Sequence, residues 1–436
     1  MAKNTVLVIG GGAAGLTAAE ALSSAGVGVT LLEGRNRLGG RMFTVRSKVG
    51  GLPIELGAEF LHGENIDTWD YVRQSGLKTH EVPDRHLRET NGELKQNLQF
   101  WEELEKVFAQ AGNEEPDQDF LSFLEKQKGV SVEARKLAIR FVEGFHAAPA
   151  NRMSVKALAR AEEASERDNA ARQFRITAGY SALTDSFAQR LKSSGVAISL
   201  NCIVKTVRWR LGRVEVLAQT PAGPRRFEAD AAVITLPLGV LQETGPQAAV
   251  FDPPLREKQP AIDGLAMGNV FKLVLQFRSP WWPMDNFGFI HASDDAIPTW
   301  WSDERGPLLT GWAGGPRAES LEHEEADKVL ARAIKTLGRL FKVRGSKIDD
   351  ALIKMYSHSW HNDPMARGAY SYTPAGMTTM PQLLAAPLAG TLFFAGEATD
   401  SQGEQGTVHG AIASGRRAAT ELLRNGPRTS LSAASS

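Results

Sequence analysis

The sequence has little cysteine and no excess of either charge. Cys202 is the single cysteine among 436 residues, and one cysteine cannot form an intramolecular disulfide, which suits a reducing compartment. Fifty basic residues balance fifty acidic ones, so the composition does not indicate nucleic acid or an anionic membrane as a partner. No apolar run is long enough to span a bilayer, and no signal peptide is visible. We therefore expect a cytoplasmic protein.

Metal and nucleophile patterns are also missing. The nine histidines show no metal-ligand spacing with one another or with Cys202, so we expect no metal site. A serine nucleophile elbow is absent as well. Any difficult chemistry would then depend on an organic cofactor, with the protein supplying its position and electrostatics. The chain is long enough for two or three domains.

The first motif is a glycine-rich turn after a short apolar strand over residues 6–9. Gly10, Gly12 and Gly15 have the spacing G-x-G-x-x-G, and a helical pattern begins near Leu16. Gly10 would allow the tight turn, Gly12 would let the backbone approach a pyrophosphate, and Gly15 would let helix and strand pack closely. The helix would direct its free amides at the pyrophosphate. Taken alone, the pattern also fits a turn without a ligand.

Glu33 strengthens the dinucleotide interpretation. A second strand, residues 27–32, ends at this glutamate, where a carboxylate is expected to meet the ribose hydroxyls of an adenine dinucleotide. The same charge repels a 2′-phosphate, which disfavours NADP. With Glu33 in this position, a dinucleotide site is favoured over a turn without a ligand.

Further motifs follow in order along the chain. They lie at residues 35–41, 55–63, 237–241, 360–372 and 392–415. With them the sequence resembles the flavin-containing amine oxidases, the superfamily of monoamine oxidases, polyamine oxidases and lysine-specific histone demethylases. The Arg-x-Gly-Gly-Arg motif of that family matches residues 37–41, and its Gly-Ala-x-x-hydrophobic-His-Gly segment matches residues 57–63. The resemblance covers residues 6–423.

The resemblance implies FAD as the cofactor. Ala369 stands where monoamine oxidases have the cysteine that bonds to the flavin, so we expect noncovalent FAD. A helix that begins near Thr407 would direct its amides at the negative charge of the reduced flavin. The backbone of Val204 matches a valine that meets the adenine. The cofactor-binding residues implied are Gly10, Gly12, Ala14, Gly15, Glu33, Arg35, Gly40, Arg41, Gly57, Ala58, Glu59, Val204, Gly396, Glu397, Thr407 and Val408.

Lys272 lies inside an apolar stretch, residues 270–277, that has the pattern of a strand. A strand lysine is usually solvated at a sheet edge, whereas a buried one needs a partner. In the amine oxidases, the matching lysine holds a water that reaches N5 of the flavin. The resemblance therefore favours a buried, catalytic Lys272.

The resemblance also implies four substrate-binding residues. Tyr370 matches one of two side chains that flank the amine in front of the flavin, and Thr407 stands where the second, often aromatic, side chain lies. His62 matches a histidine near the substrate nitrogen in polyamine oxidases, and Trp360 opens the segment that carries Tyr370. Phe60 occupies a position where the family often has tryptophan.

The expected fold is α/β, a Rossmann-like FAD-binding domain with an interleaved α+β substrate domain made of a sheet and a helical insertion. We assign residues 1–75, 195–245 and 375–424 to the FAD-binding domain, and 76–194 and 246–374 to the substrate-binding domain. Residues 425–436 are polar and small, which indicates a disordered tail. From about 69 to 171 the pattern is helical. Within it, two stripes are expected in the core, and the polar residues 161–172 are expected in solvent. The stripes are Phe100, Trp101, Leu104, Val107 and Phe108, and Leu137, Phe141 and Phe145.

The family chemistry implies hydride transfer from the carbon next to an amine nitrogen to flavin N5, hydrolysis of the imine, and reoxidation by oxygen to hydrogen peroxide. His62 favours a polyamine or secondary amine. The expected partners are a small amine and oxygen, with no nucleic acid or membrane, in a monomer or homodimer. Two alternatives stay open, which are a desaturase or protoporphyrinogen-type oxidase and a non-catalytic flavin-binding scaffold. The chain lacks the long helical insertion of the histone demethylases, which argues against a chromatin role.

Overall fold

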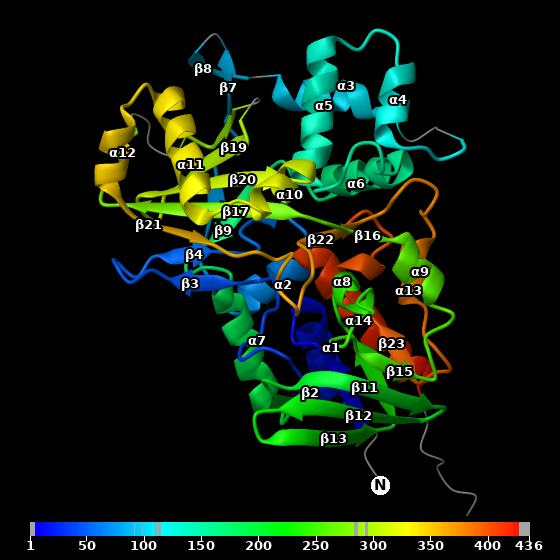
Figure 1. Ribbon diagram of the computed structural model, residues 1–436. Helices are drawn as coiled ribbons and strands as arrows, with labels where there is room; N and C mark the ends of the chain where they lie inside the picture. The colour runs from blue at the N-terminus through cyan, green and yellow to red at the C-terminus, as the bar shows by residue number, and fades with distance from the viewer. Residues whose placement is uncertain are drawn as a thin grey trace, which may run out of the picture.

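A five-stranded parallel sheet organises the lower half of the computed structural model (Figure 1). The structure describes residues 5–90, 92–97, 99–109, 111, 115–282, 287–292 and 295–426. The strand order is β10, β2, β1, β14, β23. Their bounds are Thr5–Ile9 (β1), Gly28–Leu32 (β2), Ala197–Ser199 (β10), Ala231–Ile234 (β14) and Leu392–Phe394 (β23). Segments that are distant in sequence therefore pair in one sheet.

Both faces of the parallel sheet are covered, so its strands read as continuous apolar runs. Val6 and Val8 face a cluster that includes helices α1 (Ala13–Ser24), α7 (Ser181–Ser193) and α14 (Val408–Asn425). Leu7 and Ile9 face a four-stranded sheet on the other side. That sheet has the order β13, β12, β11, β15, with bounds Gly223–Ala229, Arg213–Thr220, Ile203–Arg210 and Val250–Asp252.

Helices α1 and α14 approach each other closely because their contact surfaces are small. A Cβ added at Gly415 of α14 would lie 2.3 Å from the carbonyl oxygen of Ala14. Ala411 and Ala418 lie in the same cluster and are also buried. The small helix face formed by Ala411, Gly415 and Ala418 therefore packs close to the backbone of α1.

A seven-stranded sheet forms the wall above the parallel sheet (Figure 1). Its order is β21 (Leu352–Ser357), β17 (Val270–Phe277), β20 (Leu308–Gly314), β19 (Thr299–Asp303), β18 (Phe289–His291), β7 (His86–Thr90) and β8 (Glu93–Gln96). Helices α10 (Pro316–Glu322), α11 (Ala326–Phe341) and α12 (Gly345–Ala351) contribute apolar side chains to its core. Strand β17 lies between β21 and β20, so the alternative that places Lys272 at a sheet edge is wrong.

A helical lobe lies at the top of Figure 1. Its helices are α3 (Phe100–Phe108), α4 (Phe120–Lys126), α5 (Val132–Phe145) and α6 (Val155–Arg167). The helical prediction for residues 69–171 is wrong where β6 (Thr79–Val82), β7 and β8 lie. Strand β7 pairs with β18, about two hundred residues further along the chain, and such a distant partner leaves no local helical or strand signal.

Short elements connect these layers. They are β3 (Thr44–Arg46), β4 (Pro53–Glu55), β5 (Leu61–His62), β9 (Gln173–Ile176), β16 (Ala266–Gly268), β22 (Tyr370–Tyr372), α2 (Ile66–Gln74), α8 (Leu238–Leu241), α9 (Gln259–Gly264), α13 (Met380–Ala385) and a 3₁₀ turn at Glu397–Thr399. Within the described ranges, no helix has the length and hydropathy needed to cross a bilayer.

The division into two domains stays a prediction. Helix α7, which the predicted boundaries place in the substrate domain, packs in the same apolar cluster as α1 and α14. Of the predicted disordered tail, residues 427–436 lie outside the described residues.

Candidate active site

A cavity of about 430 Å³ lies between the parallel sheet and the seven-stranded sheet. Gly10, Glu33, Thr235 and Gly396 follow β1, β2, β14 and β23, and all four line it. Ligands of open α/β sheets bind at the carboxyl ends of the strands. The cavity therefore has the position expected for a dinucleotide site.

Gly10 and Gly15 have the conformation and the close packing predicted for them. Gly10 has φ +112°, a backbone conformation that favours glycine. A Cβ at Gly15 would lie 1.9 Å from the carbonyl oxygen of Gly10, so only glycine lets α1 begin this close to the strand. A Cβ at Gly12 would meet no protein atom within 4 Å, and Gly12 lines the cavity. Its backbone is therefore open to a ligand.

Glu33 is buried at the cavity wall, where its carboxylate binds backbone amides of two loops. One carboxylate oxygen accepts a hydrogen bond of 2.7 Å from Gly11 N, and the other accepts one of 2.8 Å from Arg35 N. Burial raises the pKa of Glu33, and the two amide hydrogen bonds oppose that rise. Each oxygen keeps a lone pair for a further donor such as a ribose hydroxyl.

The arginine-glycine motif closes one side of the cavity. Arg41 Nη1 donates to the carbonyl of Ala369 (2.8 Å) and to Glu397 Oε1 (2.9 Å). Arg35 pairs with Asp363 at 2.7 Å. A Cβ at Gly57 would lie 1.9 Å from the carbonyl oxygen of Arg41, which explains glycine at that position. Gly40, Ala58 and Glu59 line the cavity beside these residues.

Glu397 fixes the loop that leads into α14. Its Oε2 accepts hydrogen bonds from Ser371 Oγ (2.6 Å) and from Gly406 N (3.1 Å). Thr407 then caps the helix, which begins at Val408, and both residues line the cavity. The helix start predicted near Thr407 is confirmed, and its positive end lies at the cavity wall.

Lys272 is buried, as favoured from the sequence, and its side chain is 4% exposed. Its Nζ donates to Glu59 Oε2 at 2.7 Å and to the carbonyl of Gly57 at 3.2 Å. The Tyr370 hydroxyl donates to the carbonyl of Phe145 at 2.6 Å. Burial and the nearby charge of Glu397 raise the pKa of Tyr370, so its phenol is neutral.

His62 and Trp360 complete the predicted substrate side. Trp360 is buried and donates through Nε1 to the carbonyl of Leu56 at 2.9 Å. Burial lowers the pKa of His62 to about 4, so its imidazole is neutral at pH 7. The ring of His62 meets the rings of Phe60 and Phe145 edge-on. The structure thus brings His62, Lys272, Trp360, Tyr370 and Thr407 to one cavity.

Two predicted cofactor residues do not line the cavity. Gly15 acts instead through the packing of α1 on β1. The side chain of Val204 packs against the apolar cluster between the parallel and four-stranded sheets. The neighbouring Cys202 N donates to the carbonyl of Glu33 at 2.9 Å, which keeps this segment beside the cavity. Contact of Val204 with an adenine stays a prediction.

The structure adds residues that sequence reasoning missed. Phe145 was expected in the core, but it is 47% exposed, stacks on Phe141 and lines the cavity. Residues 161–172 were expected in solvent, yet many of them line the cavity as well. The added lining residues include Trp101, His146, Glu162, Asp168, Glu404 and His409. The aromatic stripe ending at Phe145 and the acidic run after Ala161 were visible signals, but neither distinguishes a cavity from core or solvent.

Asp168, Glu404 and His409 place one potential metal-ligand atom each within 4.8 Å of one another. This group is close in space and not in sequence, so histidine spacing did not indicate it. Arg167 supplies a cation there, with Nη2 at 2.7 Å from Glu404 Oε1 and Nε at 3.3 Å from Asp168 Oδ1. Asn65 Nδ2 also donates to Asp168 Oδ2 at 2.8 Å.

A dinucleotide turn, a buried lysine and a capped helix at one cavity agree with the family comparison. The sequence model of flavin-containing amine oxidoreductases matches residues 13–423. The chain belongs to this family. It is therefore a flavin-dependent oxidoreductase, and the resemblance drawn from the motifs is confirmed.

Relatives of two kinds match almost the whole chain. Lysine-specific histone demethylase 1 homolog 2 of Arabidopsis thaliana is 30% identical over 97% of this chain, which spans 58% of that protein. Polyamine oxidase 4 of Oryza sativa subsp. japonica is 28% identical over 96% of this chain and 88% of its own. A solved structure of putrescine oxidase, wild type bound to putrescine, has a TM-score of 0.80 at 22% identity and covers 97% of this chain and 99% of its own. This last likeness confirms the α/β fold.

The cofactor of the family is FAD, and the cavity wall fits it. Cβ atoms at Gly12 and Gly396 would both project into space without protein atoms within 4 Å. Helix α1 begins at Ala13 without a side-chain cap, so its first amides are available to a pyrophosphate. Glu33, Arg41 and Glu397 are charged residues of this wall that would help to hold the cofactor.

Proposed function

We propose that this chain is an amine oxidase for polyamines or related secondary amines, releasing hydrogen peroxide. The observation that carries the proposal is the single cavity that joins the glycine turn to Lys272, Tyr370 and Thr407. Bound FAD would accept a hydride from the carbon next to the amine nitrogen and return to its oxidised form with oxygen. The protein has to orient the amine, keep its nitrogen uncharged and hold a charge beside the reacting atoms.

Neutral imidazoles support an amine in this cavity. Burial lowers the pKa of His62 to about 4, and burial together with His62 lowers that of His409 to about 3. Both rings are uncharged at pH 7, so neither repels a cationic substrate. A neutral imidazole can accept a hydrogen bond from the amine or take its proton, and a nitrogen must lose its positive charge before its neighbouring carbon can give up hydride.

Acidic side chains support a substrate with a second nitrogen. Glu162 lines the cavity from α6, and burial together with Glu166 raises its pKa to about 7. Among the described residues, no hydrogen bond or ion pair is recorded for its carboxylate. Asp168 and Glu404 add two carboxyl groups to the same wall. A distal ammonium placed there would gain a charged acceptor while the other nitrogen reacts.

The comparisons support the same substrate class. Polyamine oxidase 4 is related over 96% of the chain, and the putrescine oxidase structure contains a diamine. The demethylase homologue is longer than this chain, so a peptide substrate is the second candidate among amines.

Anaerobic mixing with a matched amine panel tests the proposal. The purified protein is mixed without oxygen with spermidine, putrescine, a secondary monoamine and benzylamine, and the flavin absorbance is followed. We expect fast bleaching with the polyamines and peroxide once air is admitted. Equal bleaching by the monoamines would reject the polyamine preference. Bleaching by none of the amines, with reduction by a porphyrinogen or hydrocarbon substrate instead, would favour the desaturase or protoporphyrinogen-type alternative. A flavin that no substrate reduces would favour the scaffold.

A further inference from the structure

One buried carboxylate at the cavity wall joins two cations. Glu59 Oε2 accepts from Lys272 Nζ at 2.7 Å, and Glu59 Oε1 accepts from Arg175 Nε at 2.8 Å and from Trp301 Nε1 at 2.9 Å. We propose that Glu59 is a positioning residue that keeps the Lys272 ammonium charged and fixed at the cavity wall. The proposal rests on the proposed function, and it takes the Lys272 ammonium as the charge held beside the reacting atoms during the reaction with oxygen.

Because these side chains are buried, the charge of Glu59 strongly affects the protonation of the cations bonded to it. The side chains of Lys272 and Glu59 are each 4% exposed, and that of Arg175 is fully buried. Burial alone would raise the pKa of Glu59, but the charges of Lys272 and Arg175 outweigh it and lower the pKa to about 2. Glu59 is therefore ionised at any pH at which the enzyme would be assayed.

Only one of the two cations can respond if the carboxylate is removed. A guanidinium does not lose its proton in proteins, whereas a buried lysine does. Without Glu59, Lys272 would share a buried site with Arg175 and no carboxylate between them. Releasing the proton of Lys272 is the least costly way to remove that repulsion.

Glu59 also fixes the direction of the ammonium. Lys272 Nζ has three donors, of which one reaches Glu59 and one the carbonyl of Gly57. The third is left for the cavity, which Lys272 lines. Trp301 binds the same carboxylate, and Lys272 Nζ lies 5.8 Å from the centroid of its ring. The family motif specifies no residue type at the position of Glu59, so the motif does not predict the ion pair between Glu59 and Lys272.

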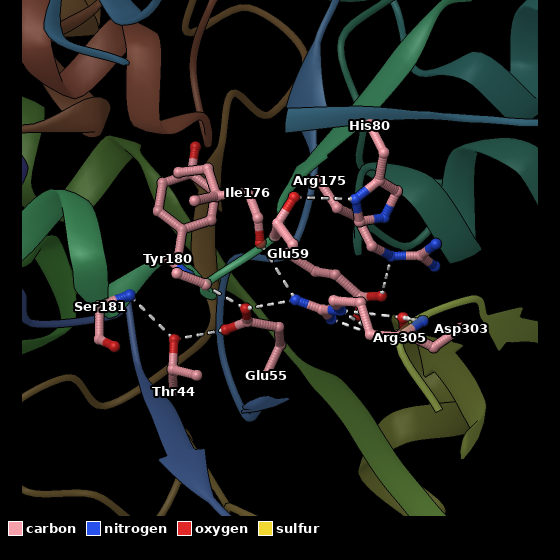
Figure 2. A network of polar contacts seen from close by, with 12 residues as sticks. Thr44, Glu55, Glu59, His80, Arg175, Ile176, Tyr180, Ser181, Asp303 and Arg305 are labelled. Carbon is pink, nitrogen blue, oxygen red and sulfur yellow. Dashed lines mark hydrogen bonds and ion pairs between the residues drawn. The ribbon is translucent and has the colours of Figure 1, made fainter. Parts of the chain in front are cut away.

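A second part of the network offers a matched control (Figure 2). Arg305 binds Asp303 through several short contacts and lies 3.5 Å from Glu55 Oε1. Glu55 also accepts from Tyr180 N and Thr44 Oγ1 and is as buried as Glu59. Glu55→Gln therefore changes a buried carboxyl group of the same network that feels the charge of Lys272 but makes no hydrogen bond to it, so the bond from Lys272 to Glu59 is kept.

The decisive measurement is reoxidation after reduction by light or dithionite, so that no amine is involved. In this step the reduced flavin anion gives two electrons and its N5 proton to oxygen, solvent gives the second proton, and hydrogen peroxide forms. We expect the rate of the unaltered protein and of Glu55→Gln to change little between about pH 6 and pH 9. In Glu59→Gln the rate should fall about tenfold across that range as Lys272 loses its proton, and should approach the rate of Lys272→Met.

Two combined variants separate charge from structure. In the Lys272→Met background, Glu59→Gln should have no further effect on reoxidation, because the residue through which it acts is gone. In the Lys272→Arg background, Glu59→Gln should lose its pH dependence, because a guanidinium keeps its charge. A Glu59→Gln effect that persists unchanged with methionine at position 272 would overturn the proposal, as would a Glu59→Gln rate that equals the unaltered rate throughout.

Lysine acetylation gives a readout that does not depend on turnover. Acetic anhydride reacts with the neutral amine, so the labelled fraction of Lys272, measured by peptide mass spectrometry, should rise in Glu59→Gln and not in Glu55→Gln. Lys258 is an internal reference, because it is equally buried and bonded to the carbonyls of Leu383 and Ala386. Should Glu59→Gln fail to fold, Arg175→Gln gives the complementary test. It removes a cation from Glu59 and leaves the bonds from Lys272 and Trp301 in place, so labelling of Lys272 should stay as low as in the unaltered protein. A rise in labelling there would contradict the proposal. Because reduction uses no amine, a failed amine panel would reject the proposed function without deciding this point.

Discussion

The hydroxyl of Thr407 accepts a hydrogen bond of 2.9 Å from Gly410 N and donates one of 2.6 Å to the carbonyl of Glu404. Thr407 is thus the N-cap of α14, and it lines the cavity as well. Losing such a cap costs about 1 kcal/mol of stability. Any substitution at this position therefore changes both the start of the helix and the wall of the site, and the two effects need separate controls.

Thr407→Tyr should shift the preference from bulky or secondary amines toward small primary ones. The family resemblance places Thr407 opposite Tyr370, where a threonine would leave room that a tyrosine would fill. An aromatic face also attracts small cations by about 0.5–2 kcal/mol. The readout is the ratio of kcat/KM for a primary amine and its N-alkyl derivative, which should change roughly 5–30-fold. Thr407→Ala removes the cap without filling the space, so it should lower stability and leave the ratio near its original value. An unchanged ratio in a flavin-loaded Thr407→Tyr protein would show that Thr407 does not face the substrate.

Glu33→Ala should weaken FAD binding by about 1.5–3 kcal/mol, because the ribose hydroxyls lose a charged acceptor. The structure adds a second consequence. The same carboxylate holds Gly11 N and Arg35 N, so the protein without FAD should also melt at a lower temperature. Glu33→Gln keeps one acceptor and should weaken binding less. Titration of FAD into the apoprotein, with thermal unfolding alongside, measures both. Full flavin content and unchanged affinity in Glu33→Ala would count against the dinucleotide assignment.

Acid precipitation should release all of the flavin into the supernatant. Ala369 has no thiol for a covalent bond, and its backbone carbonyl is held by Arg41 Nη1 at 2.8 Å. The absorbance of the supernatant at neutral pH, compared with that of the intact protein, measures the released fraction, and the mass of the denatured chain provides the control. Yellow colour or an added FAD mass in the pellet would disprove noncovalent attachment.

The parts of the fold that could be predicted are those with a local signal. Gly10 and Gly15 predict the turn because the backbone conformation of Gly10 and the close approach at Gly15 exclude other residues. Strand β17 has the predicted bounds because an unbroken apolar run leaves few alternatives. Burial of Lys272 was decided by the family resemblance, because composition alone favoured a solvated lysine.

The missed parts depend on surroundings that are distant in sequence. Phe145 belongs to the helical stripe of Leu137 and Phe141, but α5 ends beside the cavity, so its last turn has no core to enter. Glu162 and Asp168 lie in a polar stretch. A polar stretch has the same sequence pattern whether it faces a water-filled cavity or the outer surface. The approach of Glu404 to Asp168 joins two segments that no periodicity connects.

Glu162 should make the recognition of diamines dependent on pH. Burial and the charge of Glu166 raise the pKa of Glu162 to about 7, so its carboxyl group is protonated and uncharged below that pH and ionised above it. An aliphatic ammonium keeps its charge well past this range. The ratio of kcat/KM for a diamine to that for a monoamine of equal length should therefore rise as the pH increases through about 7. Dividing by the monoamine value removes the protonation of the reacting nitrogen, which both substrates share.

Two substitutions isolate this carboxylate. Glu162→Gln should lower the diamine-to-monoamine ratio about tenfold at high pH, which corresponds to about 1.4 kcal/mol. Only a smaller rise of the ratio with pH should then remain. That rise would come from Glu404, because burial also raises its pKa to about 7. Glu166 is exposed and acts on Glu162 only through its charge. In Glu166→Gln the ratio should still rise with pH, but the midpoint of the rise should move to lower pH, because one of the two causes of the raised pKa of Glu162 is gone. A Glu162→Gln protein with the same ratio at every pH would place the second nitrogen of the substrate away from α6.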